Sequence, residues 1–76
     1  MITDTIKDFY GRIIGYIETD NKGNKIVRDF HRRVLGRYDK ASNTTRDFYG
    51  RIVARGDQSA MLLPIKKTIN ISPKNL

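Results

Sequence analysis

The side chains that could do chemistry in this 76-residue chain are one histidine, eight carboxylates and 15 lysines and arginines, without any cysteine. Acid–base or nucleophilic catalysis needs complementary groups gathered at one site. His31 stands where two similar segments carry Tyr10 and Tyr49, so we interpret it as an aromatic turn residue. The sequence contains no nucleophile motif, metal-ligand spacing or nucleotide-binding loop. It therefore predicts no enzyme, no metal and no cofactor.

The chain contains three copies of a twelve-residue segment, which begin at Lys7, Arg28 and Arg46. They read KDFYGRIIGYIE over 7–18, RDFHRRVLGRYD over 28–39 and RDFYGRIVARGD over 46–57. Internal repeats of this kind reveal architecture before residue propensities do. We expect residues 1–57 to form a repeat domain and residues 58–76 to form a tail that is partly ordered or packs on the sheet.

Each copy begins with the signal of a tight turn. Residues 8–11 and 47–50 place Asp first and Gly fourth, where the carboxylate can cap the backbone and Gly can adopt a positive φ. The three equivalent aspartates are interpreted in this way, as turn residues rather than a carboxylate cluster. The linkers 20–24 and 39–43 supply the other chain reversals. The middle copy has Arg32 in place of Gly, so the same turn there would give a non-glycine residue a positive φ.

Between these turns the residues alternate and carry strong strand propensity. The sequence predicts an all-β fold, a six-stranded antiparallel meander made of three hairpin repeats in largely one sheet. The expected strands are 2–8, 12–19, 25–30, 33–39, 44–48 and 51–56. The alternative treats each copy as one strand of about 14 residues, with the internal Gly as a bulge, which gives three long strands.

The pattern Asp8-x-x-Gly11-Arg12-Ile13, followed by Asp20-x-x-Gly23-Asn24, resembles the YD (Rhs-type) repeat. The likeness covers about 50 residues, and basic residues stand where that family has Tyr. The resemblance implies tandem β-hairpins. It implies no function, because three hairpins are too few to enclose another protein as the family's large shells do, and a fold carries no site with it.

Strict alternation sorts the strand residues onto two faces. One face is an apolar stripe with a trough of small residues along its middle, and it needs a second layer. The tail, with Met61, Leu62, Leu63, Ile65, Ile69 and Ile71, could fold back as a strand or short helix. A second copy of the chain could cover the stripe instead. The predicted self-association residues are Ile13, Gly15, Ile17, Val34, Gly36, Tyr38, Ile52 and Ala54.

The other predicted face carries arginine and tyrosine, as single-stranded nucleic-acid platforms do. Rows of acidic residues beside the arginines offer a second interpretation, a solvated charge ladder without a ligand. Acidic proteins and lipid headgroups are further partners for a basic surface. The predicted nucleic-acid residues are Arg12, Tyr16, Arg33, Arg37, Arg51 and Arg55.

The net charge of +7 and the 38% hydrophobic content describe a small basic domain with a thin core. No apolar run is long enough to span a bilayer, and nothing resembles a secretion signal, so we expect a cytoplasmic protein without membrane insertion. The predicted function is a small structural or protein-interaction module that forms homo-oligomers or binds another protein. The alternative is a module that binds single-stranded nucleic acid.

Overall fold

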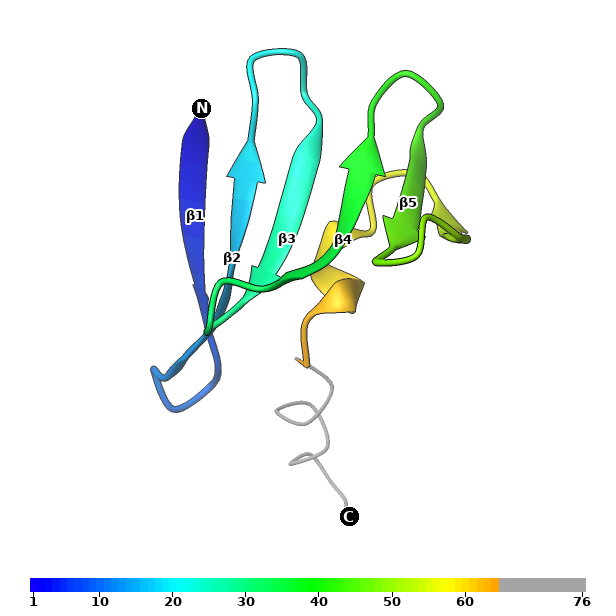
Figure 1. Ribbon diagram of the computed structural model, residues 1–76. Coiled ribbons are helices and arrows are strands. Elements are labelled where there is room, and N and C mark those ends of the chain that lie inside the picture. Colours follow the sequence, from blue (N-terminus) through cyan, green and yellow to red (C-terminus); the bar gives the residue numbers. More distant parts are fainter. Residues whose placement is uncertain (65–76) are drawn as a thin grey trace.

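The computed structural model describes residues 1–64 and shows one open sheet of six antiparallel strands, in the order β1-β2-β3-β4-β5-β6 (Figure 1). Each strand pairs with its neighbour in sequence, and one 3-10 helix follows the last strand. The elements are β1 (Ile2–Lys7), β2 (Ile13–Thr19), β3 (Lys25–Asp29), β4 (Val34–Asp39), β5 (Thr44–Asp47), β6 (Ile52–Arg55) and η1 (Ser59–Leu62). The predicted six-stranded meander is confirmed, and the alternative of three long strands is wrong.

The repeated Asp-x-x-Gly segments form turns because their backbone groups pair locally. The amide of Gly11 donates to the carbonyl of Asp8 at 3.0 Å, and Gly11 has a φ of 84°. The amide of Asp8 donates to the carbonyl of Arg12 at 2.8 Å, which closes the loop. The same pairs recur in the other two copies, and Arg32 occupies the glycine place with a φ of 69°. The middle turn therefore keeps the geometry of the others despite its non-glycine residue.

A β-bulge follows each of these turns. In the first hairpin Lys7 faces Ile13 while Ile6 faces Gly15, so Ile14 is an extra residue. Equivalent register shifts leave Leu35 and Val53 as the extra residues of the second and third hairpins. A bulge places two successive side chains on one side of the strand, which interrupts the alternation.

The bulges correct the predicted faces. Register partners share a face of the sheet, so Ile13, Val34 and Ile52 lie on the same face as Lys7, Arg28 and Arg46. Strict alternation placed these three apolar residues on the opposite, core face, and that assignment is wrong. Ile14 and Leu35 pack against the core in their place.

The core lies on one face of the sheet, here called the covered face, where η1 packs. Ile17, Val27 and Leu63 form its centre. Glycines in β2 and β4 leave room for the leucines at the end of η1: a Cβ on Gly15 would overlap the Leu63 side chain, and a Cβ on Gly36 would lie 2.8 Å from Leu62. The small-residue trough is therefore filled by the same chain. The remaining apolar tail residues Ile65, Ile69 and Ile71 lie outside the described residues.

Polar contacts hold the segment that leads from β6 to η1 beneath the sheet. The hydroxyl of Thr45, a fully buried residue, donates to the carbonyl of Gly56 at 2.8 Å and accepts from the amide of Gln58 at 3.0 Å. Asp57 accepts from the hydroxyl of Ser59 at 2.7 Å and pairs with Lys25. These bonds position Leu62 and Leu63 over the trough.

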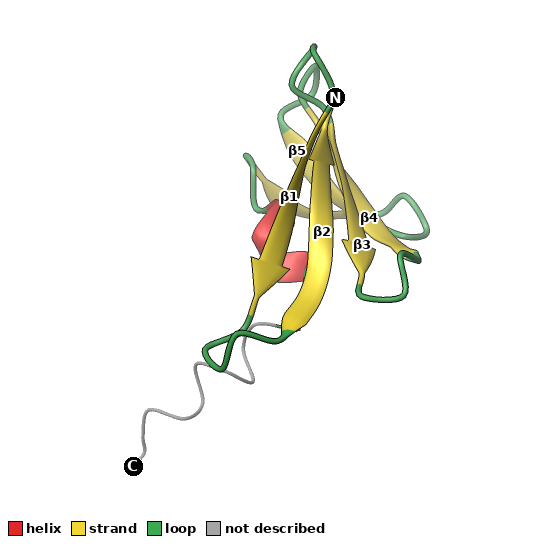
Figure 2. Cartoon of the chain, turned by 90° about the vertical axis from the view of Figure 1, so that its left-hand side faces the viewer, coloured by secondary structure: helices red, strands yellow, loops and turns green. Residues whose placement is uncertain are grey.

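The opposite face of the sheet, here called the open face, is not covered by η1. Figure 2 shows the twist of the sheet, with β5 crossing the direction of β1. Strands β1 and β6 form its two edges. Among residues 1–64, no helix has the length and apolar character needed to cross a membrane.

Candidate functional site

The structure separates the six residues of the predicted nucleic-acid face into two groups. Tyr16, Arg37 and Arg55 lie in strands on the open face. Arg12, Arg33 and Arg51 lie in the turns that precede β2, β4 and β6, and each has a side chain that is 74% exposed. These turn arginines do not form the row across the strands that alternation predicts.

Each turn arginine is bound to the aspartate that begins its own turn. The Nε of Arg12 donates to Oδ2 of Asp8 at 2.9 Å, while Oδ1 of Asp8 accepts the backbone amides of Tyr10 and Arg12. Asp29 and Asp47 make the same three bonds in their copies. One carboxylate thus fixes both the turn backbone and the direction of an arginine.

These bonds keep the carboxyls ionised. The backbone amide of Arg12 is the largest influence on Asp8 and lowers its pKa. Burial raises the pKa of Asp29, but the backbone amide and guanidinium of Arg33 lower it by more, and Asp47 behaves in the same way. The carboxylates are occupied as acceptors within their turns.

Four arginines from four successive strands share the open face. Arg37 lies directly opposite Arg46, and Arg28 lies directly opposite Tyr16. Sequence reasoning missed Arg28 and Arg46, because alternation does not anticipate the bulges. The available signal was that both residues are the first residue of their repeat copy, a position that is basic in all three copies. The open-face arginines are Arg28, Arg37, Arg46 and Arg55.

The charges of the open-face arginines are only partly neutralised. The Nε of Arg28 donates to Glu18 at 3.1 Å, and Arg46 donates to the carbonyl of Gly50 at 2.9 Å. Within residues 1–64, Arg37, Arg46 and Arg55 make no ion pair. Like charges directly opposite each other destabilise a sheet unless an anion lies between them. The Arg37 and Arg46 pair is therefore a place where an anion would be favourable.

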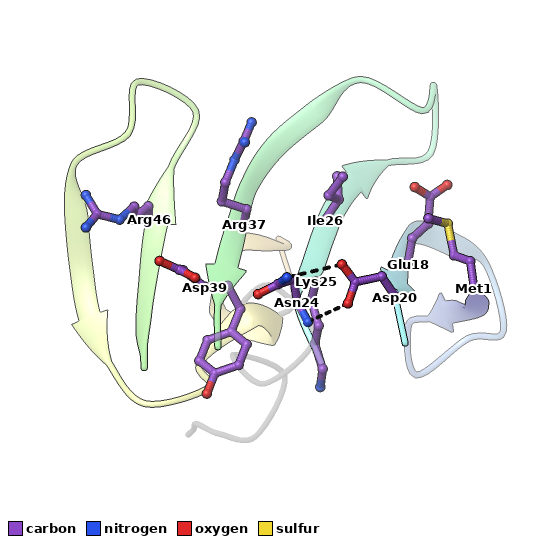
Figure 3. Close-up of a pocket in the computed structure, with 10 residues that line it drawn as sticks. Met1, Glu18, Asp20, Asn24, Lys25, Ile26, Arg37, Asp39 and Arg46 are labelled. Carbon is purple, nitrogen blue, oxygen red and sulfur yellow. Dashed lines mark hydrogen bonds between the residues drawn. The ribbon is translucent and has the colours of Figure 1, made fainter. Parts of the chain in front are cut away.

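A shallow depression of about 440 Å³ lies beside this pair, and Figure 3 shows the side chains around it. Arg37 and Arg46 border it together with the carboxylates of Glu18, Asp20 and Asp39. Asp20 accepts the amides of Lys22 and Asn24, and Asp39 accepts the amide of Ala41, so both serve as turn caps. Among the described residues, no cluster of His, Cys, Asp or Glu could hold a metal ion. Because these carboxylates would repel an anion inside the depression, we expect an anion to bind above Arg37 and Arg46 instead.

The predicted self-association residues do not form one exposed face. Gly15, Ile17, Gly36 and Tyr38 are buried within the chain, and Ala54 is half-buried. Ile13, Val34 and Ile52 lie on the open face for the reason given above. The residues of the predicted apolar stripe therefore lie on two different faces, and η1 covers those on the covered face.

No known family model, curated protein or solved structure matches this chain. The resemblance to YD repeats stays a resemblance of sequence pattern.

Proposed function

We propose that this chain binds single-stranded nucleic acid through the arginines of its open face. The Arg37 and Arg46 pair is the observation that carries the proposal, because two directly opposed cations create a favourable position for a phosphate. Arg28 and Arg55 lie on the same face but outside this row, opposite Tyr16 and Thr44. A strand of nucleic acid carries a phosphate at every nucleotide, so it can meet several of these arginines at once.

The surface suits an extended single strand better than a duplex. A sheet face that carries cations can follow the backbone of an extended strand, whereas duplex readout uses an element inserted into a groove. Tyr16 supplies little of this stacking, because the guanidinium of Arg32 lies 4.2 Å from the centre of its ring. Electrostatic contact with phosphates is therefore the main contribution of the open face.

The test measures binding of a fluorescein-labelled 12-nucleotide oligothymidine by anisotropy over a range of salt concentrations. Affinity should fall steeply with salt, and Arg37→Gln combined with Arg46→Gln should weaken binding and make the salt dependence shallower, since two phosphate contacts are lost. The control is Lys22→Gln combined with Lys40→Gln, which removes the same charge at exposed turn positions and should change binding little. Absence of binding at low salt would contradict the proposal.

Self-association is the second candidate function, and the open edges of the sheet favour it. Edge strands present unpaired backbone groups that can pair with another chain. Ile2 on β1 is 68% exposed and Ile52 on β6 is 50% exposed, so both edges also carry apolar surface. Sedimentation at micromolar concentration should show a dimer or larger species that Ile2→Lys disrupts. A strictly monomeric folded chain would rule this function out.

A further inference from the structure

Aromatic residues stand exposed at the three turns that share one end of the sheet. Because the strands form a meander, the turns between β1 and β2, β3 and β4, and β5 and β6 lie at the same end. Each turn has two ring residues at its centre, and the five Phe and Tyr side chains among them are between 57% and 78% exposed. We call these three pairs the turn tips: Phe9 with Tyr10, Phe30 with His31, and Phe48 with Tyr49.

The rings of the turn tips are held in fixed arrangements. Phe9 and Tyr10 meet edge to face, with centroids 5.5 Å apart and planes at 84°, and Phe48 and Tyr49 repeat this at 5.3 Å and 82°. The guanidiniums of the turn arginines lie 5.3 Å from the tyrosine ring centres in both tips. Since the aspartate caps fix the backbone beneath, the tips offer rigid rings at little entropic cost to a ligand.

The end of the sheet that carries the turn tips is also its basic end. The residues at and beside these turns include seven basic side chains and three acidic ones: Lys7, Arg12, Arg28, Arg32, Arg33, Arg46 and Arg51 against Asp8, Asp29 and Asp47. The two turns at the other end, counted in the same way, carry a smaller surplus: Lys22, Lys25 and Lys40 against Asp20 and Asp39. An anionic ligand is therefore attracted to the same end that exposes the rings.

The spacing and twist of the tips suit a flexible polymer as the ligand. Successive tips are two strands apart, which is about 10 Å. The sheet twists by about 20–25° per strand, so successive tips turn by about 40–50° relative to each other. The crossing of the strands in Figure 2 follows from this twist. A single strand of nucleic acid is flexible enough to follow three tips that face different directions.

We infer that each turn tip stacks a nucleobase of a single-stranded nucleic acid whose phosphates lie along the neighbouring arginines. This inference rests on the proposed function and names the groups that bind the bases. The three tips span about 20 Å, which an extended strand covers in several nucleotides. Stacking on rings tolerates any base, so binding should show little sequence preference.

The experiment uses the full chain and oligothymidines of 3, 6, 9 and 12 nucleotides. Affinity should rise with length until all three tips are occupied and then change little. Phe9→Ala, Phe30→Ala and Phe48→Ala should each weaken binding of the 12-mer about fivefold or more, since each removes one stacking contact. Stacking should also quench the tyrosine fluorescence of the tips. Ile2→Ala is the control, because Ile2 is 68% exposed and begins β1, at the end of the sheet opposite the tips.

The outcomes separate this inference from the function on which it rests. Unchanged affinity in the three tip variants, with affinity lost in the Arg37→Gln and Arg46→Gln variant, would overturn the stacking role and leave the open face as the binding surface. Binding to vesicles containing phosphatidylserine but not to oligothymidine would overturn both. Circular dichroism of every variant confirms that the sheet is intact, and the tyrosine quenching of the unmodified chain tests stacking without any substitution.

Discussion

The residue after the two turn aromatics decides the backbone geometry of each tip. Gly11, Gly50 and Arg32 occupy this place with φ values of 84°, 85° and 69°. Such values cost a non-glycine residue about 1–2 kcal/mol. Arg32 recovers part of this cost through its position over the ring of Tyr16. In the middle turn, the contact between Arg32 and Tyr16 therefore offsets part of the backbone strain.

The paired substitutions Arg32→Gly and Gly50→Ala test this balance. Arg32→Gly should be neutral or stabilise the fold by less than about 1 kcal/mol, because relief of strain outweighs a cation–π contact of about 0.5–1 kcal/mol. Gly50→Ala should destabilise it by about 1 kcal/mol. No atom lies within 4 Å of a Cβ built on Gly50, so only strain acts there. Urea unfolding measures both, and a clear loss of stability in Arg32→Gly would contradict the account.

At the scale of the elements, the turns were predictable from sequence and the faces were not. The repeated turn segments and the two linkers define local hydrogen bonds that need no tertiary context, so all six strands could be predicted from them. No local sequence pattern identifies Ile14, Leu35 and Val53 as the extra residues, because a bulge depends on pairing across two strands. The open-face arginines Arg28 and Arg46 were missed for this reason.

The partner of the small-residue trough was likewise undecided in the sequence. Gly15 and Gly36 indicated that something approaches the sheet closely, and both the tail and a second copy had suitable apolar side chains. The choice depends on where the chain goes after Arg55, which contacts of Thr45 and Asp57 determine. Such long-range polar contacts have no signature in the local pattern.

The contact between η1 and the trough makes a testable prediction at this scale. Leu63→Ala should destabilise the fold by about 2–4 kcal/mol, since Leu63 is 4% exposed and its loss leaves a cavity. Gly15→Ala should also destabilise it, because the new methyl group would overlap Leu63 and the carbonyl of Arg28. Thermal unfolding measures both losses. Met61→Ala, at an exposed position of η1, is the control and should have little effect.

At the scale of the whole molecule, aspartates make the stability of the fold depend on pH. Five of them have a pKa below the ordinary value of 3.8: Asp8, Asp20, Asp29, Asp47 and Asp57. Burial raises the pKa of Asp57, but hydrogen bonds from Lys25 and Ser59 lower it by more. Because each carboxyl binds protons less readily in the folded chain, its contribution is complete above this ordinary value and is lost as pH falls through the folded pKa.

The chain should therefore be most resistant to urea near neutral pH and lose stability as pH falls below about 4. Asp29→Asn should lower the stability at pH 7 and reduce the loss on acidification, because one of the titrating groups is gone. Asp4→Asn is the control, since Asp4 makes no ion pair within the described residues. Equal stability at pH 7 and pH 3 would show that the caps contribute little.

The series of hairpins ends at Gly56, which occupies the place held by Ile17 and Tyr38 in the earlier copies. Its φ of 80° turns the chain beneath the sheet, and no seventh strand follows within residues 1–64. An open meander has no ring to close, so its geometry does not fix the number of hairpins. Duplication of a segment upstream of Gly56 would lengthen the row of tips without altering the segment from Gly56 to η1. Evolution could adjust the reach of this surface one hairpin at a time.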